Sequence, residues 1–475
     1  MKLSILNKIL LAIQFILTVV VIGYLLVMNV LPTQYLILLS LILILLWLIV
    51  LVLIKLGKTK GIIGKILSVL LSVAMVVSLN FVIKGDGALH NITAPTTQTH
   101  TYALVVMKDS ELNSIDDINQ QSILYNEAFA DENFMKCKDV LGKLKPNIDW
   151  VTTTNIEDMI SLLYDGEVDG VLLNEAFISS FEEVIDTFNT DTKVIWTYDL
   201  DQKVEDFSKD INVTEDTFTI YISGIDTRGK VSTVSRTDVN MLVTINPKTK
   251  QILMTSIPRD YYVTLANYGK EDKLTHSGLG GVENSVKTIE NFMGIDINYY
   301  ARVNFTSMVN IVDALGGINV YSPVAFNTTS INVSFKQGYN YLDGEKALIF
   351  VRERKNLPNG DNDRVANQQR VLKAMIDKMI SPTIITNYTQ ILNAIAGSFE
   401  TNMKSEDITS LIKMQINDMA SWEFETVQLK GKGVRQYGGA MMPDSYLYYM
   451  LPDLDSVNAC ATLIERMVNG EDITE

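Results

Sequence analysis

The chain has 475 residues, which is too long for one compact core and predicts two or more domains. Its formal net charge of -15 at pH 7 argues against nucleic acid as a partner, because affinity for nucleic acid depends on a basic surface. With only three histidines and two cysteines, a histidine-ligated metal, a zinc site, a Ser-His-Asp triad and a disulfide framework are all disfavoured. A single bridge between Cys137 and Cys460 stays open.

Three apolar segments stand at the start of the chain, at residues 9–28, 35–54 and 66–83. Each is long enough to cross the hydrocarbon of a bilayer as a helix. The first is too long for the apolar part of a signal peptide, and a second apolar segment follows it directly. Residues 1–83 are therefore predicted to be a membrane anchor with three transmembrane helices.

Lysines indicate the orientation of this anchor. Lys2 and Lys8 precede the first segment, and four lysines lie between the second and the third. Because loops rich in lysine stay in the cytoplasm, three crossings place the chain after residue 83 outside the cell. The protein is thus predicted to be a multi-pass protein of the cell membrane whose C-terminal domains are extracellular.

The composition changes after the anchor. Residues 84–100 are small and polar and are predicted to be a linker. In residues 101–212, apolar runs such as YALVVM and VDGVLLN alternate with the amphipathic stretch NIEDMISLL, which Asn155 would cap. Alternation of this kind predicts a small accessory α/β domain. It contains no catalytic cluster.

Residues 213–475 form the second predicted globular unit. A strand over TFTIYISGI is followed by two strands that the turn NPKTK joins. The run ALIFV is predicted to be a further strand, and amphipathic helices are predicted over GGVENSVKTIENFMG, MVNIVDALGG and RVANQQRVLKAMIDKMI. The pattern predicts a mixed sheet flanked by helices, so the fold class is α/β.

Cations are concentrated in VRERKNLPNGDNDRVANQQR, at residues 351–370. If ALIFV continues as a strand, Arg352 and Arg354 project from the same face. Arg364 and Gln368 share a helix face near a helix N-terminus, which favours anions. Guanidinium groups bind phosphate oxygens in pairs and keep their charge, so the stretch predicts an anion site. A solvated loop with surface ion pairs would account for this stretch as well.

Three further motifs favour the anion site. GIDTRG contributes Asp226, SRTDVN contributes Arg236 and Asp238, and SIPRD contributes Arg259, each beside a predicted strand end. Ligands of α/β sheets tend to bind beyond strand ends. Asp226 and Asp238 are hard oxygen donors for Mg²⁺ or Mn²⁺, although each could instead be a cap or an arginine partner. Together these residues predict a diphosphate site with its metal, whereas His276 is predicted to be structural.

The chain resembles the LytR-CpsA-Psr (LCP) family over roughly residues 216–380, through GIDTRG, SRTDVNMLVTINP, SIPRDYYV, KLTHSG, NYYARVNFTSMVNIVDALGGINV, LDGEKALIFVRER and DNDRVANQQRVL. The three-span anchor followed by an extra domain resembles the streptococcal CpsA-type capsule members. Two positions depart from the family pattern. KLTHSG stands for the common KINHAY and NQQ for the usual RQQ, which puts any role of Thr275 and Asn367 in doubt.

The resemblance implies an extracytoplasmic phosphotransferase of Gram-positive cell walls. Such an enzyme moves a glycopolymer, capsular or teichoic in type, from polyprenyl pyrophosphate to peptidoglycan, and other proteins of capsule synthesis are further partners. The polyprenyl tail would lie in an apolar channel within the core. Mapped by motif, the pyrophosphate would be bound by Arg236, Arg259, Arg352, Arg354, Arg364 and Gln368. The metal ligands would be Asp226 and Asp238, and these two with Arg236 and Arg259 form the predicted catalytic set.

In the predicted reaction a peptidoglycan hydroxyl attacks the phosphorus next to the sugar, and polyprenyl phosphate leaves. Mg²⁺ and the arginines neutralise the charge, and the pyrophosphate bond supplies the energy, so no ATP is needed. Asp226 or Asp260 is the predicted base. Two alternatives stay open: a regulatory protein that senses lipid-linked intermediates without chemistry, and a phosphatase of polyprenyl pyrophosphate that uses water as the acceptor.

Overall fold

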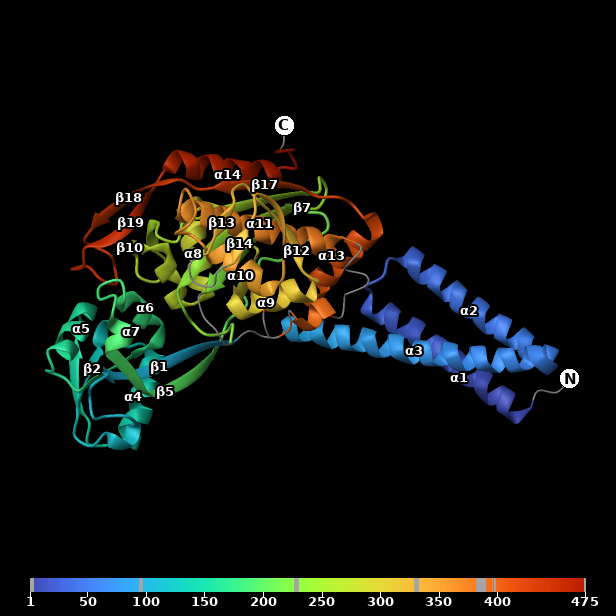
Figure 1. Ribbon diagram of the computed structural model, residues 1–475, viewed down its shortest axis with the longest axis horizontal. Coiled ribbons are helices and arrows are strands. Elements are labelled where there is room, and N and C mark those ends of the chain that lie inside the picture. Colours follow the sequence, from blue (N-terminus) through green and yellow to red (C-terminus); the bar gives the residue numbers. More distant parts are fainter. Residues whose placement is uncertain are drawn as a thin grey trace.

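A computed structural model describes residues 4–93, 97–225, 230–328, 333–381, 390–394, 396 and 399–473. A bundle of three long helices projects from the globular part of the molecule (Figure 1). The globular part contains two main sheets, a smaller one in blue-green and a larger one in green to red. The predicted α/β class, with apolar helices first and a mixed sheet later, is confirmed.

The N-terminal bundle confirms the three predicted apolar helices. All three are long and apolar enough to cross a membrane. They are α1 (Ile5–Met28), α2 (Thr33–Leu56) and α3 (Lys58–Ile92).

The predicted linker over residues 84–100 is wrong on its described residues. Residues 84–92 continue α3, and residues 97–100 already belong to strand β1. The helix continues because one of its faces is apolar and packed: Ala88, Leu89 and Ile92 are buried in one cluster with Leu392. A small polar composition alone does not reveal such a contact.

The accessory part is a five-stranded sheet in the order β3-β2-β4-β1-β5. Strand β1 is antiparallel to β4 and β5, whereas β2 is parallel to β3 and β4. Asn155 caps α5 as predicted, since its side chain accepts the N–H of Glu157 at 2.9 Å. The elements are β1 (Thr97–Met107), η1 (Ile115–Asp117), β2 (Ser122–Asn126), η2 (Glu127–Phe129), α4 (Glu132–Leu144), β3 (Asp149–Thr153), α5 (Ile156–Tyr164), β4 (Gly170–Asn174), η3 (Glu175–Phe177), α6 (Ile178–Phe181), α7 (Phe188–Asp191) and β5 (Thr192–Lys203).

The larger sheet has six strands in the order β16-β11-β6-β7-β8-β17. It is mixed, because β11 is parallel to β6 and β17 to β8, whereas the other neighbours are antiparallel. The hairpin of β7 and β8 forms around the predicted turn. The strands are β6 (Phe218–Ile225), β7 (Thr237–Asn246), β8 (Gln251–Ile257), β11 (Tyr299–Asn304), β16 (Phe399–Thr401) and β17 (Glu423–Gln428).

Alternation along these strands gives the sheet two different faces. On one face Tyr221 and Leu242 are fully buried in a core with residues of α8 (Val282–Met293) and α14 (Leu454–Val468). On the other face Ile222 and Met241 belong to an apolar cluster with residues of α11 (Asp361–Ile380). This second face lines a cavity, described below.

The run ALIFV is a helix, and the strand predicted there is wrong. It lies in α10 (Gly344–Arg352), whose N-cap Asp343 accepts the N–H of Lys346 at 2.9 Å. A short apolar run has no periodicity that separates a strand from a buried helix, and here the cap decides. Arg352 therefore ends a helix, and it does not share a strand face with Arg354.

The other described elements of the larger part complete the frame around its sheet. Paired short strands are β9 with β10, β12 with β15, β13 with β14, and β18 with β19. These elements are β9 (Tyr262–Leu265), β10 (Lys270–Lys273), η4 (Leu274–Gly280), α9 (Phe305–Ala314), β12 (Ile318–Ser322), β13 (Phe326–Asn327), β14 (Ser334–Phe335), β15 (Gly338–Leu342), α13 (Ser405–Asp418), β18 (Gly431–Gln436) and β19 (Leu447–Pro452).

The accessory part and the larger part share a hydrophobic core. Leu163 and Phe181 are buried in one cluster with Met441 of the larger part. The boundaries at 101–212 and 213–475 stay predictions, because these contacts join the two parts into one packed unit. Both cysteines are buried and free, Cys137 in α4 and Cys460 in α14, so no disulfide links them.

Candidate functional site

A cavity of about 700 Å³ lies between the second face of the large sheet and helices α9, α10 and α11. Most of its wall is apolar, because the strands point one alternating set of side chains into it. Its apolar wall includes Ile220, Ile222, Met241, Val243, Ala301, Val303, Met308, Leu372 and Met375. The charged residues of the wall are Asp238, Arg259, Arg352, Arg354 and Arg364, with Gln368 beside them. Six of the eight predicted site residues thus line one cavity.

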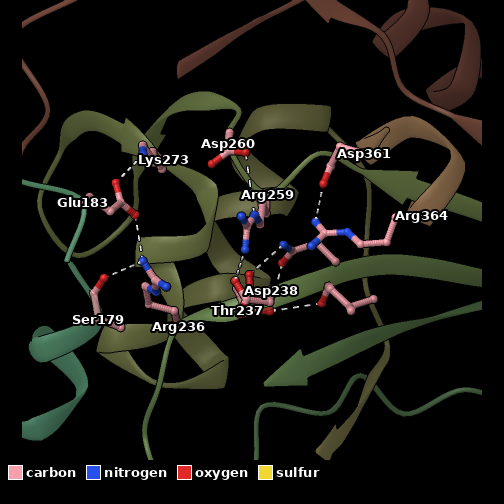
Figure 2. A network of polar contacts seen from close by, with 12 residues as sticks. Ser179, Glu183, Arg236, Thr237, Asp238, Arg259, Asp260, Lys273, Asp361 and Arg364 are labelled. Carbon is pink, nitrogen blue, oxygen red and sulfur yellow. Dashed lines mark hydrogen bonds and ion pairs between the residues drawn. The ribbon is translucent and has the colours of Figure 1, made fainter. Parts of the chain in front are cut away.

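The polar residues come from three separate segments that meet at one end of the sheet. Arg259 follows β8, and its Nη1 donates to Oδ1 of Asp238 in the neighbouring strand β7 at 2.8 Å. Arg364 lies in the first turn of α11, with its Nη2 2.8 Å from Oδ1 of Asp361 (Figure 2). Arg352 stacks its guanidinium 4.3 Å from the ring centre of Phe305.

Two of the arginines in the cavity wall carry a buried donor without a hydrogen bond to the residues that the structure describes. The Nε groups of Arg259 and Arg364 are buried and donate no hydrogen bond within the described part of the chain. Burial lowers the pKa of Arg364, and the positive charges of Arg259 and Arg354 lower it further, against the opposing effect of Asp361. An anion between these guanidinium groups would relieve their mutual repulsion. Buried cations with spare donors are the arrangement that a diphosphate requires.

Carboxylates hold Arg259 in place. Burial by itself lowers the pKa of Arg259, but Asp238 and Asp260 outweigh it and raise the pKa above its ordinary value. Burial also raises the pKa of Asp260, although Arg259 and Lys273 oppose this effect. A carboxylate with a raised pKa is a better proton acceptor at neutral pH than an ordinary aspartate.

Arg236 is not among the described residues that line the cavity. Its Nη1 donates to Oε1 of Glu183 at 2.7 Å and to the carbonyl oxygen of Ser179 at 3.1 Å, both in the accessory part (Figure 2). Lys273 also pairs with Glu183, and Nε2 of His276 lies 3.9 Å from Oε1 of Glu183. The structure therefore separates Arg236 from the other predicted arginines, and its role toward pyrophosphate stays a prediction.

Sequence reasoning missed Glu183 and Lys273. Glu183 lies 53 residues before Arg236, in a region predicted to carry no chemistry, and FEEVID gives no signal of a partner so far along the chain. Burial raises the pKa of Glu183, but His276, Lys273 and Arg236 together outweigh it and lower the pKa, so the carboxylate is ionised. His276, predicted to be structural, is buried, with Nδ1 3.0 Å from Oδ1 of Asp272.

Replacing Glu183 with glutamine is expected to lower the free energy of unfolding by about 2 kcal/mol at pH 7, because it leaves buried cations without their counter-charge. The contribution of a carboxylate with a lowered pKa is complete above its unfolded pKa, about 4.3, and is lost as the pH falls through the lower folded value. The difference in the free energy of unfolding between Glu183→Gln and wild type should therefore shrink as the pH falls from about 5 to about 3, through the unfolded-state pKa and below it. Thermal unfolding of the full-length protein in detergent measures it.

The control for this prediction is Asp186→Asn, at an exposed acid three residues further on. It should leave unfolding unchanged at both pH values. A Glu183→Gln variant as stable as wild type at pH 7 would contradict the prediction.

Of the two predicted metal ligands, the structure describes one. Asp226 lies outside the described residues. Asp238 lines the cavity with 15% of its side chain exposed and gives one oxygen to Arg259. Among the described residues no group of three or more histidine, cysteine and acidic side chains is placed to hold a metal. Mg²⁺ needs only one or two carboxylates when phosphate oxygens complete its shell, and the hard oxygens of Asp238 fit that requirement.

The two positions that depart from the family pattern do not enter the cavity wall as described. Asn367 is buried, and its Oδ1 accepts from Nη1 of Arg370 at 2.7 Å. Thr275 is buried in η4. Gln368, next to Asn367 in the chain, does line the cavity, and its role toward pyrophosphate stays a prediction.

Comparison with known proteins gives matches to one family. A model of the LytR_cpsA_psr family matches residues 183–462. The polyisoprenyl-teichoic acid–peptidoglycan teichoic acid transferase TagU of Bacillus anthracis is 32% identical over 300 residues, which cover 62% of this chain and 95% of that protein. TagU of Bacillus licheniformis is 34% identical over 268 residues, covering 56% of this chain and 83% of that protein. The crystal structure of TagV of B. subtilis aligns with a TM-score of 0.46 and 28% identity, over 54% of this chain and 99% of that one.

Proposed function

The chain belongs to the LytR-CpsA-Psr family, and from this membership we propose that it transfers a glycopolymer from polyprenyl pyrophosphate to peptidoglycan. The observation that carries the proposal is a single cavity with arginines at one end and an apolar body behind them. Such a cavity suits a ligand with a diphosphate head and a hydrocarbon tail. The curated relatives are named for moving teichoic acid from a polyisoprenyl carrier to peptidoglycan, which supports this kind of substrate.

The three apolar helices support a membrane location. We propose that all three span the membrane and that the lysines before α1 and between α2 and α3 face the cytoplasm. The globular part then lies outside the cell, where peptidoglycan and the lipid-linked polymer meet. Membership of the CpsA-type subgroup, and contact with other capsule proteins, remain predictions of the sequence.

In the proposed reaction a peptidoglycan hydroxyl attacks the phosphorus attached to the sugar. A new phosphorus–oxygen bond forms to the acceptor, the bond to the bridging oxygen breaks, and polyprenyl phosphate leaves. Arg259, Arg354 and Arg364 bind the diphosphate and neutralise the charge that moves to the leaving group. Asp260, whose Oδ2 lies 3.7 Å from Nε of the cavity-lining Arg259 and whose pKa is raised by burial, is the proposed acceptor of the hydroxyl proton; Asp226 is the other candidate.

A divalent cation would be held by Asp238 together with Asp226 and would supply positive charge next to the phosphate oxygens. The side chains provide the remaining positioning. Arg352, fixed over the ring of Phe305, and Gln368 extend the polar end of the cavity. Holding both reactants in line accounts for much of the catalysis in phosphoryl transfer.

The proposed transfer is tested with full-length protein in phospholipid vesicles, given undecaprenyl pyrophosphate that carries a disaccharide, Mg²⁺ and peptidoglycan fragments. Release of undecaprenyl phosphate together with sugar phosphate bound to the acceptor supports the transferase. Tight binding without turnover would favour the sensor. Free sugar phosphate formed even with acceptor present would favour the phosphatase.

Removal of divalent cations is expected to lower this turnover by about 10²-fold or more, because the two positive charges of the cation no longer neutralise the diphosphate. Treatment with EDTA followed by added Mg²⁺ or Mn²⁺ measures the effect and its reversal. Added Ca²⁺, which prefers more ligands at longer distances, should restore less activity. Full activity in EDTA would contradict a role for the cation.

A further inference from the structure

The cavity has a second end, away from the arginines. Strand register defines it: Ile225 of β6 lies beside Asn304 of β11 at the charged end, whereas Ile220 lies beside Tyr299 at the opposite end. Ile220 belongs to an apolar cluster that also contains Ile408 and Leu411 of α13. These two side chains, with Ile412, line the cavity.

The outer end of α3 lies along the β16 edge of the cavity, between its two ends: Phe399 pairs with Val303 near the charged end, and Ile408 belongs to the apolar cluster at the opposite end. Leu89 and Ile92 line the cavity and are only 2% and 4% exposed. They form one cluster with Leu392, against which Phe399 and Ile408 pack. Because Ile408 takes part in both apolar clusters, the last turn of α3 is continuous with the cavity wall. Figure 1 shows α3 running from the bundle to the globular part.

This part of the cavity wall lies close to the outer ends of the apolar helices. Leu89 follows Ile83, the last residue of the apolar segment, by six positions, about 9 Å along a helix. On α13, Nζ of Lys413 donates to Oδ1 of Asn29 at 2.7 Å, and Asn417 accepts from Gln34 at 3.1 Å. Asn29 follows the last residue of α1, and Gln34 lies in the first turn of α2, so α13 contacts the helix bundle where these two helices meet.

An apolar tail needs such a path. Each methylene group exposed to water costs about 0.8 kcal/mol, so a long prenyl chain does not cross an aqueous gap. With the diphosphate at Arg259 and Arg364, the part of the cavity wall that leads toward the apolar helices is the one that α3 and α13 line.

We propose that the last turn of α3 and the facing side of α13 form a portal through which the polyprenyl tail passes directly from the outer leaflet into the cavity. The inference rests on the proposed function for the identity of the lipid. It assigns α3 a place in the substrate site in addition to anchoring, with Leu89 and Ile92 as positioning residues for the tail.

The test compares two substrates with the same disaccharide pyrophosphate head, one on an undecaprenyl chain in vesicles and one on a geranyl chain in free solution. Leu89→Lys places a charge in the portal of the full-length protein. The matched control is His90→Lys, which introduces the same lysine on the exposed side of the same helical turn, next to Asp86. Leu89→Lys is expected to raise KM for the undecaprenyl substrate by about tenfold or more and to leave turnover of the geranyl substrate within about twofold of wild type. His90→Lys should alter neither.

A second variant, Ile92→Trp, narrows the portal without a charge and should show the same selectivity for tail length. Unchanged undecaprenyl turnover in both variants would overturn the portal. Equal loss with both substrates in both variants would overturn it as well, because the effect would not depend on the tail. Binding of the two lipids is measured in parallel. Wild-type protein that binds them without turnover would contradict the transferase, while the comparison of tail lengths in binding still decides the portal.

Discussion

Replacing Arg259 with alanine is expected to lower the rate of undecaprenyl phosphate release by about 10³-fold, the size of effect seen when a preorganised donor to a transferring phosphate is removed. Arg259 lies in the cavity wall, is held by Asp238 at 2.8 Å and has a buried Nε without a hydrogen bond within the described residues. Asp238 therefore fixes the orientation of the guanidinium group at the charged end of the cavity. Turnover in vesicles, with binding of the lipid measured separately, checks the result.

Arg259→Lys keeps the charge but not the planar fork and should lose about tenfold, between wild type and alanine. Arg435→Ala removes an exposed arginine on β18 and should change nothing, which controls for loss of positive charge as such. If Arg259→Ala retains turnover within about twofold of wild type, Arg259 does not contact the diphosphate in the transition state.

Removing the carboxylate of Glu400 is expected to cost about 4 kcal/mol of stability and to lower the melting temperature by roughly 10 °C. Glu400 of β16 pairs across the sheet with Arg302 of β11, and Nη1 of Arg302 lies 3.9 Å from Oε2. Both side chains are buried, at 3% and 8% exposure. Burial lowers the pKa of Arg302, and Glu400 opposes that effect, so Glu400→Ala leaves a buried guanidinium without its counter-charge.

Thermal unfolding of the full-length protein in detergent measures this loss. The matched control is Glu425→Ala, an exposed acid on β17 at the other edge of the same sheet, which should lower the melting temperature by no more than about 2 °C. The double variant Glu400→Ala with Arg302→Met should recover part of the stability, because it removes the unpaired charge. Equal stability of Glu400→Ala and wild type would show that Arg302 is satisfied without the carboxylate. Nη2 of Arg302 donates to the carbonyl oxygen of Thr233 at 2.6 Å, so the loss should also disturb the segment that leads to Arg236.

Local sequence patterns were sufficient for most secondary structure of the large domain. The hairpin around NPKTK, the helix that ends before Gly294 and the long helix over RVANQQRVLKAMIDKMI are all present, and the last of these begins three residues earlier than predicted, at Asp361. Each combines a clear period with a turn residue or a cap, and these signals act within a few residues of the chain. The ALIFV run lacked a period, and only the cap of Asp343 reveals a helix.

For the candidate site, the residue types could be predicted from the sequence, whereas their grouping in space could not. Its cations and acids stand out in the sequence, because clustered arginines are unusual in an acidic chain, and four of the predicted arginines meet Asp238 and Gln368 in one cavity. Their grouping depends on the packing of α11 against the sheet, which brings the start of β7 and the end of β8 beside the start of α11. The packing of α11 on this sheet is a long-range property, so it enters the sequence reading only through family resemblance.

By itself, then, the sequence determined the three apolar helices, the alternating strands and helices, and the residue types of an anion site, since these depend on neighbours along the chain. Only the tertiary structure decided that Arg236 pairs with Glu183 and that α3 continues to Leu89 and Ile92 in the cavity wall. Both are contacts between segments far apart in sequence. Their free energy comes from burial and paired charge in the folded chain, which no local pattern encodes.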